Sequence, residues 1–209
     1  MVRVKPFDLL SERYDAWFEK HPYAYLSELE ALKRCVGGGV RLGLEVGVGG
    51  GRFSQPLGIQ FGVDPSLSML REARLRGVEV VRGVGERLPF TDSVFDLVLM
   101  VTTICFLDDV DASFLEVKRV LKRGGKFTLG FIDGESELGK KLKTRRDNPF
   151  YAEATLYSVR EVLAHLERAG FREYRTLQTI FQDPENISTM EPVKEGYGEG
   201  SFVVVCAKT

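Results

Sequence analysis

The sequence predicts an α/β protein with a doubly wound, mostly parallel sheet of seven strands that ends in an antiparallel C-terminal hairpin. Two observations predict this class. Short apolar runs alternate with helix-type segments along most of the chain, which is typical of a parallel sheet covered by helices on both faces. A glycine-rich segment also directly follows the first apolar run, and this is where parallel strands of such sheets meet their ligands.

The N-terminal segment, residues 7–36, is rich in aromatic residues and ends in a helix. Apolar residues recur at helical spacing from Leu26 to Val36, and three glycines at 37–39 end that helix. The first two strands follow at 42–48 and 58–63, with only a short crossover between them.

The middle of the chain continues the alternation. Ser66 can cap a helix over 67–76 that ends at Gly77, and strands follow at 78–81 and 95–101. The second of these strands is apolar enough to be central in the sheet.

The last third holds one more βα unit and the closing strands. A helix is expected from Asp111, then a strand at 126–132 and a polar, basic, loop-like segment over 133–156. Ser158 and Glu161 form a capping box that opens another helix. Two final strands, around 174–181 and 202–207, are expected to form an antiparallel hairpin.

Length and composition favour one soluble domain. The chain has 209 residues, which suits a single core; 44% of them are hydrophobic and 28% charged, as is usual for globular proteins. We expect a helical cap over 1–39, a cofactor-binding core over 40–133, a variable insertion over 134–157, and a C-terminal helix and hairpin over 158–209.

Charge and hydropathy exclude other classes. A net charge of −1 argues against non-specific nucleic-acid binding, and the longest apolar run, 97–107, is too short to span a bilayer. The N-terminus has no signal-peptide core. The three cysteines, Cys35, Cys105 and Cys206, are odd in number and far apart, which predicts reduced thiols in a cytoplasmic protein.

The glycine-rich segment is the strongest local signal. Residues Leu42 to Val48 alternate as a buried strand does, and the glycines that follow let the backbone turn sharply and approach a ligand. Residues 52–54 are expected to begin a helix whose free N–H groups face that ligand. A dinucleotide fingerprint needs a third glycine where Arg52 stands, so this pattern fails.

Two acidic residues favour a different cofactor. Glu45 precedes the glycines, where a carboxylate suits an ammonium group better than a pyrophosphate. Asp64 ends the second strand and is placed to accept hydrogen bonds from two ribose hydroxyls. An adenosine-bearing amino acid would satisfy both carboxylates.

Four motifs carry a resemblance to a known family. They are LEVGVGGGRFS, GVDPS, GVGERLPFTDSVFDLVLM and FLEVKRVLKRGG. In this order and spacing, over about residues 8–133, they resemble class I S-adenosylmethionine-dependent methyltransferases, a Rossmann-like family. The subgroup most similar in pattern is the small enzymes of quinone biosynthesis.

The resemblance implies a set of cofactor-binding residues. In chain order these are Glu45, Gly47, Gly49 and Gly51 around the methionine portion, Asp64 on the ribose, Pro65, Gly85 and Glu86 near the adenine, and Val101 and Thr102 near the sulfonium. Two departures stand out. Val84 replaces the aspartate that commonly takes the adenine amino group, and Arg123 replaces a proline in a turn.

The sequence indicates the residues that contact the substrate less clearly than those that contact the cofactor. Tyr14, Trp17 and Phe18 resemble an aromatic cap that closes over the cofactor, although aromatic residues at this spacing also pack ordinary cores. His21 is a candidate to face substrate. No catalytic base is assigned, because methyl transfer from a sulfonium relies mainly on positioning. No cluster has metal-ligand spacing, so no metal is expected.

The insertion leaves two interpretations open. The basic stretch 140–146 follows the fifth strand and either borders the site of an anionic substrate or forms a solvated face. Together these features predict a cytoplasmic enzyme that uses S-adenosylmethionine to methylate a small molecule. The alternatives are a non-catalytic protein that binds the same cofactor and a dinucleotide-dependent oxidoreductase.

Overall fold

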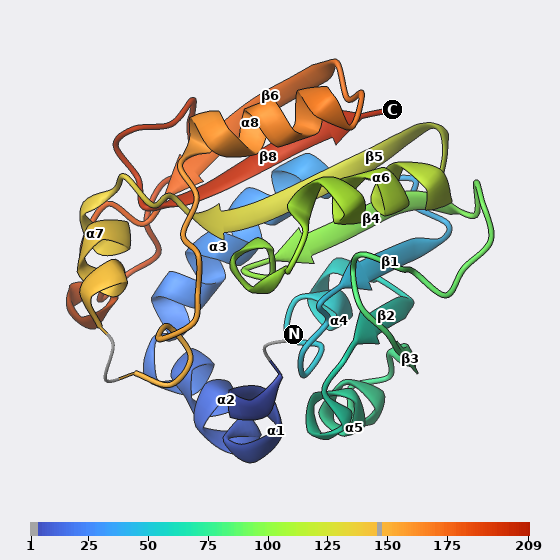
Figure 1. Ribbon diagram of the computed structural model, residues 1–209. Coiled ribbons are helices and arrows are strands. Elements are labelled where there is room, and N and C mark those ends of the chain that lie inside the picture. Colours follow the sequence, from blue (N-terminus) through green and yellow to red (C-terminus); the bar gives the residue numbers. More distant parts are fainter. Residues whose placement is uncertain (1–3, 146–147) are drawn as a thin grey trace.

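The computed structural model describes residues 4–145 and 148–209, and these form an eight-stranded mixed sheet (Figure 1). The strand order is β3-β2-β1-β4-β5-β8-β6-β7. The strands are β1 (Gly43–Val46), β2 (Phe61–Asp64), β3 (Glu79–Arg82), β4 (Phe95–Val101), β5 (Leu121–Ile132), β6 (Glu173–Thr179), β7 (Lys194–Glu195) and β8 (Phe202–Lys208). The first five are parallel, and β8 runs antiparallel between β5 and β6.

Helices connect β1 to β2, β2 to β3 and β4 to β5, and further helices precede β1 and follow β5. The described α-helices are α1 (Lys5–Leu9), α2 (Ser11–Lys20), α3 (Pro22–Val36), α4 (Ser54–Leu57), α5 (Leu67–Leu75), α6 (Val110–Val120), α7 (Glu137–Thr144) and α8 (Val159–Arg168), with single 3₁₀ turns at Ile104–Phe106 and Pro184–Asn186. Expected caps are present: Ser66 accepts from Met69 N–H, and Ser158 and Glu161 form the capping box.

Successive side chains of a strand point to opposite faces of the sheet, and apolar side chains on both faces form two hydrophobic cores. On β4, Val98 and Met100 pack toward α6 and α8, whereas Leu97, Leu99 and Val101 pack toward α3. All five are at most 4% exposed. Figure 1 shows α6 and α8 on one face of the sheet and α3 on the other. Burying both faces requires near-continuous apolar strands, as the sequence of β4 indicates.

The first helices and α7 lie near one end of the sheet. The arrowheads of β4 and β5 point toward the side of the molecule where α1, α2 and α7 lie (Figure 1). The carboxyl ends of parallel strands are where α/β sheets bind ligands, and β1 and β4 flank the point at which strand order reverses. The fold therefore directs the aromatic N-terminal segment to this end.

The expected strand count and the expected loop after β5 were both wrong. The sheet has eight strands and not seven, because two residues of the connection between β6 and β8 pair with the edge of β6 as β7. The pairing involves main-chain atoms of Lys194 and Glu195, and no alternation of apolar side chains in the sequence predicts a strand there. The insertion after β5 also contains helix α7, whose N-cap Ser136 accepts from Gly139 N–H.

The glycine loop continues further than expected. Residues 52–54 do not form the first turn of a helix; α4 begins at Ser54 and has four residues. Main-chain N–H groups of the loop bond within the protein, from Gly47 and Val48 to Val63 O and from Gly51 to Val48 O. The loop therefore offers a ligand a close backbone surface and few free donors.

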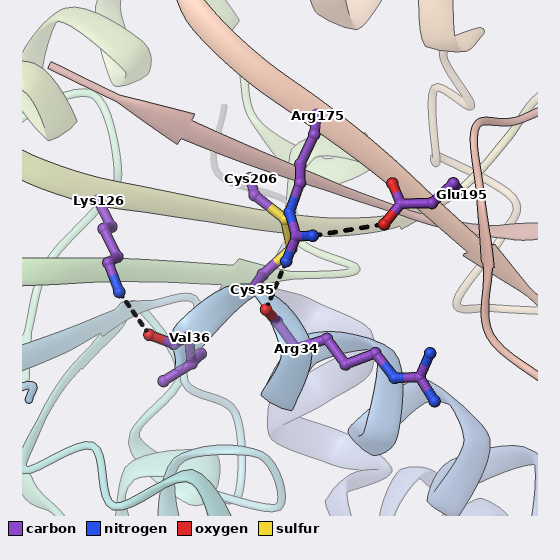
Figure 2. Close-up of a disulfide and its surroundings, with 7 residues drawn as sticks. All are labelled: Arg34, Cys35, Val36, Lys126, Arg175, Glu195 and Cys206. Carbon is purple, nitrogen blue, oxygen red and sulfur yellow. Dashed lines mark hydrogen bonds and ion pairs between the residues drawn. A yellow bond between two sulfur atoms is a disulfide. The ribbon is translucent and has the colours of Figure 1, made fainter. Parts of the chain in front are cut away.

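The prediction of three reduced cysteines was also wrong, because Cys35 and Cys206 form a disulfide (Figure 2). Cys35 is in the last turn of α3, and Cys206 is in β8. Their Cα atoms are 5.4 Å apart, within the usual range for a disulfide, although 171 positions separate them in sequence. The pairing follows from the packing of α3 on β8, and it removes the argument that linked the cysteines to the cytoplasm.

Polar contacts hold the same helix end. Lys126 donates to Val36 O at 3.0 Å, and Arg175 donates to Arg34 O at 2.7 Å while it pairs with Glu195 (Figure 2). Carbonyl groups in the last turn of a helix have no partner within the helix, so these cations satisfy them. The disulfide thus reinforces a junction that the sheet already supports.

We expect reduction of this disulfide to destabilise the fold by about 2–5 kcal/mol, because it closes a very long loop in the unfolded chain. Urea unfolding with and without dithiothreitol measures the difference. The double variant Cys35→Ser/Cys206→Ser is the control, and its stability should not respond to the reductant. Equal stability of the wild type in both conditions, with all three thiols open to alkylation after unfolding, would contradict the disulfide.

Candidate active site

In the first turn after β1, the main chain at Gly47 and Gly49 lies close to the side chains of Thr103 and Tyr14. Gly47 has φ +72°, and a Cβ there would lie 2.2 Å from Thr103 Oγ1. Gly49 has φ +50°, and the atom nearest to a Cβ at that position would be Tyr14 Cε1, at 4.0 Å. Both backbone conformations favour glycine. Gly47 is therefore required for packing, while Gly49 leaves open space above the loop.

Asp64 lies beside this loop at the end of β2. Its Oδ2 accepts from Gly49 N–H at 3.0 Å, and its Oδ1 accepts from Ser66 N–H at 2.8 Å. Burial raises the pKa of Asp64 to about 6, against the opposing effect of these two hydrogen bonds. A carboxylate has about four acceptor sites, so each oxygen can accept a further hydrogen bond.

A cavity of about 90 Å³ adjoins these groups. Most of the predicted cofactor residues line it: Gly47, Gly49, Asp64, Pro65, Gly85, Glu86, Val101 and Thr102. They come from the carboxyl ends of four different strands and from the loops that follow them, and the switch in strand order brings them together. Phe7 of α1 also lines the cavity and packs on Phe106 with ring centroids 5.0 Å apart, so the N-terminal segment covers the cavity.

Two predicted residues, Glu45 and Gly51, do not line this cavity. Glu45 is 1% exposed, and its carboxylate accepts from Ser54 Oγ at the start of α4. Burial raises the pKa of Glu45 to about 8. Gly51 packs on α5, where a Cβ would lie 3.1 Å from Ala73 Cα. Both residues support the loop from behind, and their direct contact with cofactor stays a prediction.

The part of the cavity predicted to hold the adenine is also lined by residues that the motifs did not indicate. Glu86 accepts from the N–H groups of Asp108 and Asp109, so its carboxylate ties the loop after β3 to the start of α6. Val84, Leu107 and Asp108 line the cavity as well. Leu107 and Asp108 follow the 3₁₀ turn after β4, and no sequence motif marks them.

A second cavity, of about 460 Å³, adjoins the first. Tyr14, Thr102 and Phe106 line both cavities. The cap candidates Tyr14, Trp17, Phe18 and His21 all line the second cavity. The rings of Tyr14 and Phe18 pack edge to face at 5.6 Å, as do those of Trp17 and Phe18 at 5.3 Å. The same aromatic residues therefore enclose the cavity and pack helix α2.

Charged groups fix α2 to the glycine loop. Asp15 forms ion pairs with Arg52 and Arg76, and Arg76 also donates to Gly50 O at 2.6 Å. These cations hold the pKa of Asp15 below its ordinary value against the effect of burial. Arg52, which occupies the position of the third glycine of a dinucleotide fingerprint, thus anchors the aromatic cap.

Glu28 of α3 is a buried acid in the wall of the second cavity. It is 7% exposed, and burial raises its pKa to about 8. Within the described part of the chain, no hydrogen bond or ion pair involves its carboxylate. Burial also raises the pKa values of Tyr14 and Tyr151, and the negative charge of Glu28 contributes to both shifts. Sequence patterns did not single out Glu28, because it lies on an otherwise ordinary amphipathic helix.

The mouth of the second cavity is bordered by charged side chains. Lys20 pairs with Glu185 at 2.8 Å, and Lys141 pairs with Asp183. Part of the predicted basic stretch therefore does border the cavity, through Lys141 and Arg145. Arg146 lies outside the described residues. His21 is buried, with Nδ1 3.2 Å from Pro184 O.

Neither a metal cluster nor a membrane span occurs within residues 4–145 and 148–209. No group of three or more His, Cys, Asp or Glu side chains there could hold a metal ion. No helix in those ranges has the length and apolarity needed to cross a bilayer.

Comparison with known proteins identifies the family. Residues 44–129 match the family model of a methyltransferase domain. A Thermotoga maritima protein, described as an S-adenosylmethionine-dependent methyltransferase and possible histamine N-methyltransferase, is 44% identical over 99% of both chains, with a TM-score of 0.95. The chain belongs to the class I S-adenosylmethionine-dependent methyltransferases.

Two further relatives show how far this methyltransferase resembles others. An uncharacterised protein of Methanocaldococcus jannaschii is 44% identical over 97% of this chain and 98% of its own length. A demethylmenaquinone methyltransferase of Corynebacterium kroppenstedtii is 36% identical over 90 residues, or 43% of this chain and 39% of that enzyme. The similarity to quinone-type enzymes is thus distant.

The site of this methyltransferase fits the family's cofactor, S-adenosylmethionine. Asp64 retains acceptor capacity for ribose hydroxyls, and Gly49 borders open space where a ligand can approach the main chain. Thr102 follows β4 at the junction of the two cavities with φ +47°, a conformation that L-residues seldom adopt. Strain of this kind is found mainly where function holds a residue in place.

Proposed function

We propose that this methyltransferase moves the methyl group of S-adenosylmethionine to a small molecule bound in the second cavity. The observation that carries the proposal is the junction of the two cavities at Tyr14, Thr102 and Phe106. A volume of about 460 Å³ lies within the range of about 300–1,000 Å³ common to small-molecule sites. The net charge of −1 does not favour a nucleic-acid substrate, so we propose none.

The cofactor, when bound, supplies a methyl group on a positively charged sulfur. The protein's contribution is to hold donor and acceptor in line, which can provide about 7–11 kcal/mol of a reaction barrier. Asp64 orients the ribose, the loop at Gly47 and Gly49 supports the amino-acid portion, and Thr102 lies where the two ligands meet. The aromatic residues of α2 exclude water from that junction. No side chain is assigned as a catalytic base.

The proposal is tested by cofactor titration followed by an acceptor screen. Calorimetry should show micromolar binding of S-adenosylmethionine and S-adenosylhomocysteine and no comparable binding of NAD. Methyl transfer from labelled cofactor is then measured on small amines, thiols, phenols and carboxylates, with histamine included because of the Thermotoga protein. Tight cofactor binding with no transfer to any acceptor class would favour a non-catalytic binding protein. NAD binding alone would reject the proposal.

A further inference from the structure

Glu28 is a buried carboxylate in an aromatic cavity. It lines the cavity together with Trp17, Phe18 and Tyr151, and within the described residues no hydrogen bond or ion pair involves its carboxylate. Its neighbour on the helix, Ser27, by contrast, donates to Tyr23 O and accepts from Glu191 N–H. Ser27 therefore has a structural role that Glu28 does not share.

A buried carboxylate without a partner destabilises a folded protein, because the charge loses its hydration and gains nothing in return. The burial of Glu28 raises its pKa to about 8, in agreement with this cost. A ligand cation would offset the cost by pairing with the carboxylate, and aromatic faces nearby would add a favourable interaction with the same cation.

We propose that the acceptor cavity selects organic amines, whose ammonium group pairs with the carboxylate of Glu28 among the aromatic side chains. This inference rests on the proposed function, since it concerns the acceptor of the same reaction. Glu28 is assigned as a binding and specificity residue.

The cations at the mouth of the cavity do not favour an anionic acceptor over an amine. Lys20 and Lys141 are already paired with acidic side chains. Arg13 and Arg145 are exposed, so water screens their charges. Glu28, at 7% exposure, is the buried acid among the described residues that line this cavity, and charge interactions are stronger where water is excluded.

Three probes that share a phenyl ring and differ in charge test the proposal. They are phenethylamine, phenethyl alcohol and 3-phenylpropanoate, titrated calorimetrically into the full chain saturated with S-adenosylhomocysteine. We expect phenethylamine to bind about 10- to 100-fold more tightly than the alcohol, as charged hydrogen-bond pairs usually allow. Glu28→Gln should remove this preference and leave the affinity for the alcohol unchanged.

The matched control is Glu30→Gln, which removes the same charge from the same helix at a position outside the cavity, where Glu30 pairs with Arg34. It should leave every affinity unchanged. Thermal unfolding at pH 7 gives a second, ligand-independent readout: Glu28→Gln should raise the Tm of the ligand-free protein, because the wild-type carboxyl, whose pKa burial raises to about 8, must take up a proton on folding and the glutamine need not. A lower Tm would assign Glu28 a structural role.

The outcomes separate the two proposals. If S-adenosylhomocysteine does not bind the wild type, the proposed function fails. If it binds, the amine proposal is overturned by tighter binding of the alcohol or the carboxylate, by the absence of phenethylamine binding, or by an unchanged affinity for phenethylamine in Glu28→Gln.

Discussion

Asp64→Ala is expected to weaken binding of S-adenosylmethionine by about 10²- to 10⁴-fold, because two hydrogen bonds to a charged acceptor contribute about 1.5–3 kcal/mol each. The carboxylate also fixes the neighbouring main chain through Gly49 N–H and Ser66 N–H. Its loss therefore removes both the ribose contacts and part of the support for the loop. Calorimetric titration of the purified variant measures the change.

The matched control for Asp64 is Asp96→Ala. Asp96 also accepts a main-chain hydrogen bond, from Leu42 N–H at 2.9 Å, and it pairs with Lys122, but it lies near the start of β4, away from the cofactor cavity. Cofactor affinity should not change in this variant. Undiminished binding by Asp64→Ala would refute the assigned role.

The affinity of the wild type for S-adenosylmethionine should also depend on pH. Because burial raises the pKa of Asp64 to about 6, the wild type should lose affinity as pH falls below that value and the carboxylate becomes protonated. Calorimetric titration across this pH range measures the change.

Gly47→Ala should have the largest structural effect of any single change at the site. Its Cβ would meet Thr103 Oγ1 at 2.2 Å and Thr103 Cγ2 at 2.4 Å, and its φ of +72° adds backbone strain. Thr103 donates to Val101 O, so it cannot move without disturbing the end of β4. We expect the free energy of unfolding to fall by more than about 3 kcal/mol in total. This loss exceeds the cost of backbone strain alone, because the collision with Thr103 adds to it. Urea unfolding measures it.

Gly77→Ala isolates the strain from the collision. Gly77 has φ +83°, and none of the described neighbouring atoms lies within 4 Å of a Cβ at that position. This variant should lose only about 1–2 kcal/mol, the cost of an L-residue in a left-handed conformation. Equal losses in the two variants would mean that Thr103 gives way and that the close approach at Gly47 is not essential.

Local patterns in the sequence were sufficient to predict the five parallel strands and the cofactor loop. Apolar runs such as Phe95–Val101 have strand length and are bounded by turn residues, and β4 has those bounds in the structure. Asp64 was predicted because its position at a strand end is itself defined by such a run. Each of these signals depends on residues that are adjacent in sequence.

Long-range pairings could not be predicted in the same way. Cys35 and Cys206 carry no signal of their disulfide, because it depends on α3 packing against β8. The edge strand β7 depends on the exposed edge of β6. The hydrogen bond that Glu45 accepts from Ser54 Oγ likewise depends on where α4 packs, and the motif that contains Glu45 does not indicate it.

The sequence by itself determined where the parallel strands lie along the chain, the position of the glycine loop and the class of cofactor, because these depend on periodicity, backbone freedom and residue type within short segments. The tertiary structure alone decided which aromatic residues enclose the second cavity and that Glu28 lies in its wall, unpaired among the described residues. Burial and the absence of a partner are properties of the whole packed chain. The sequence therefore indicated the methyl donor, and only the packing of α2, α3 and α7 around one cavity indicates the chemistry of the acceptor.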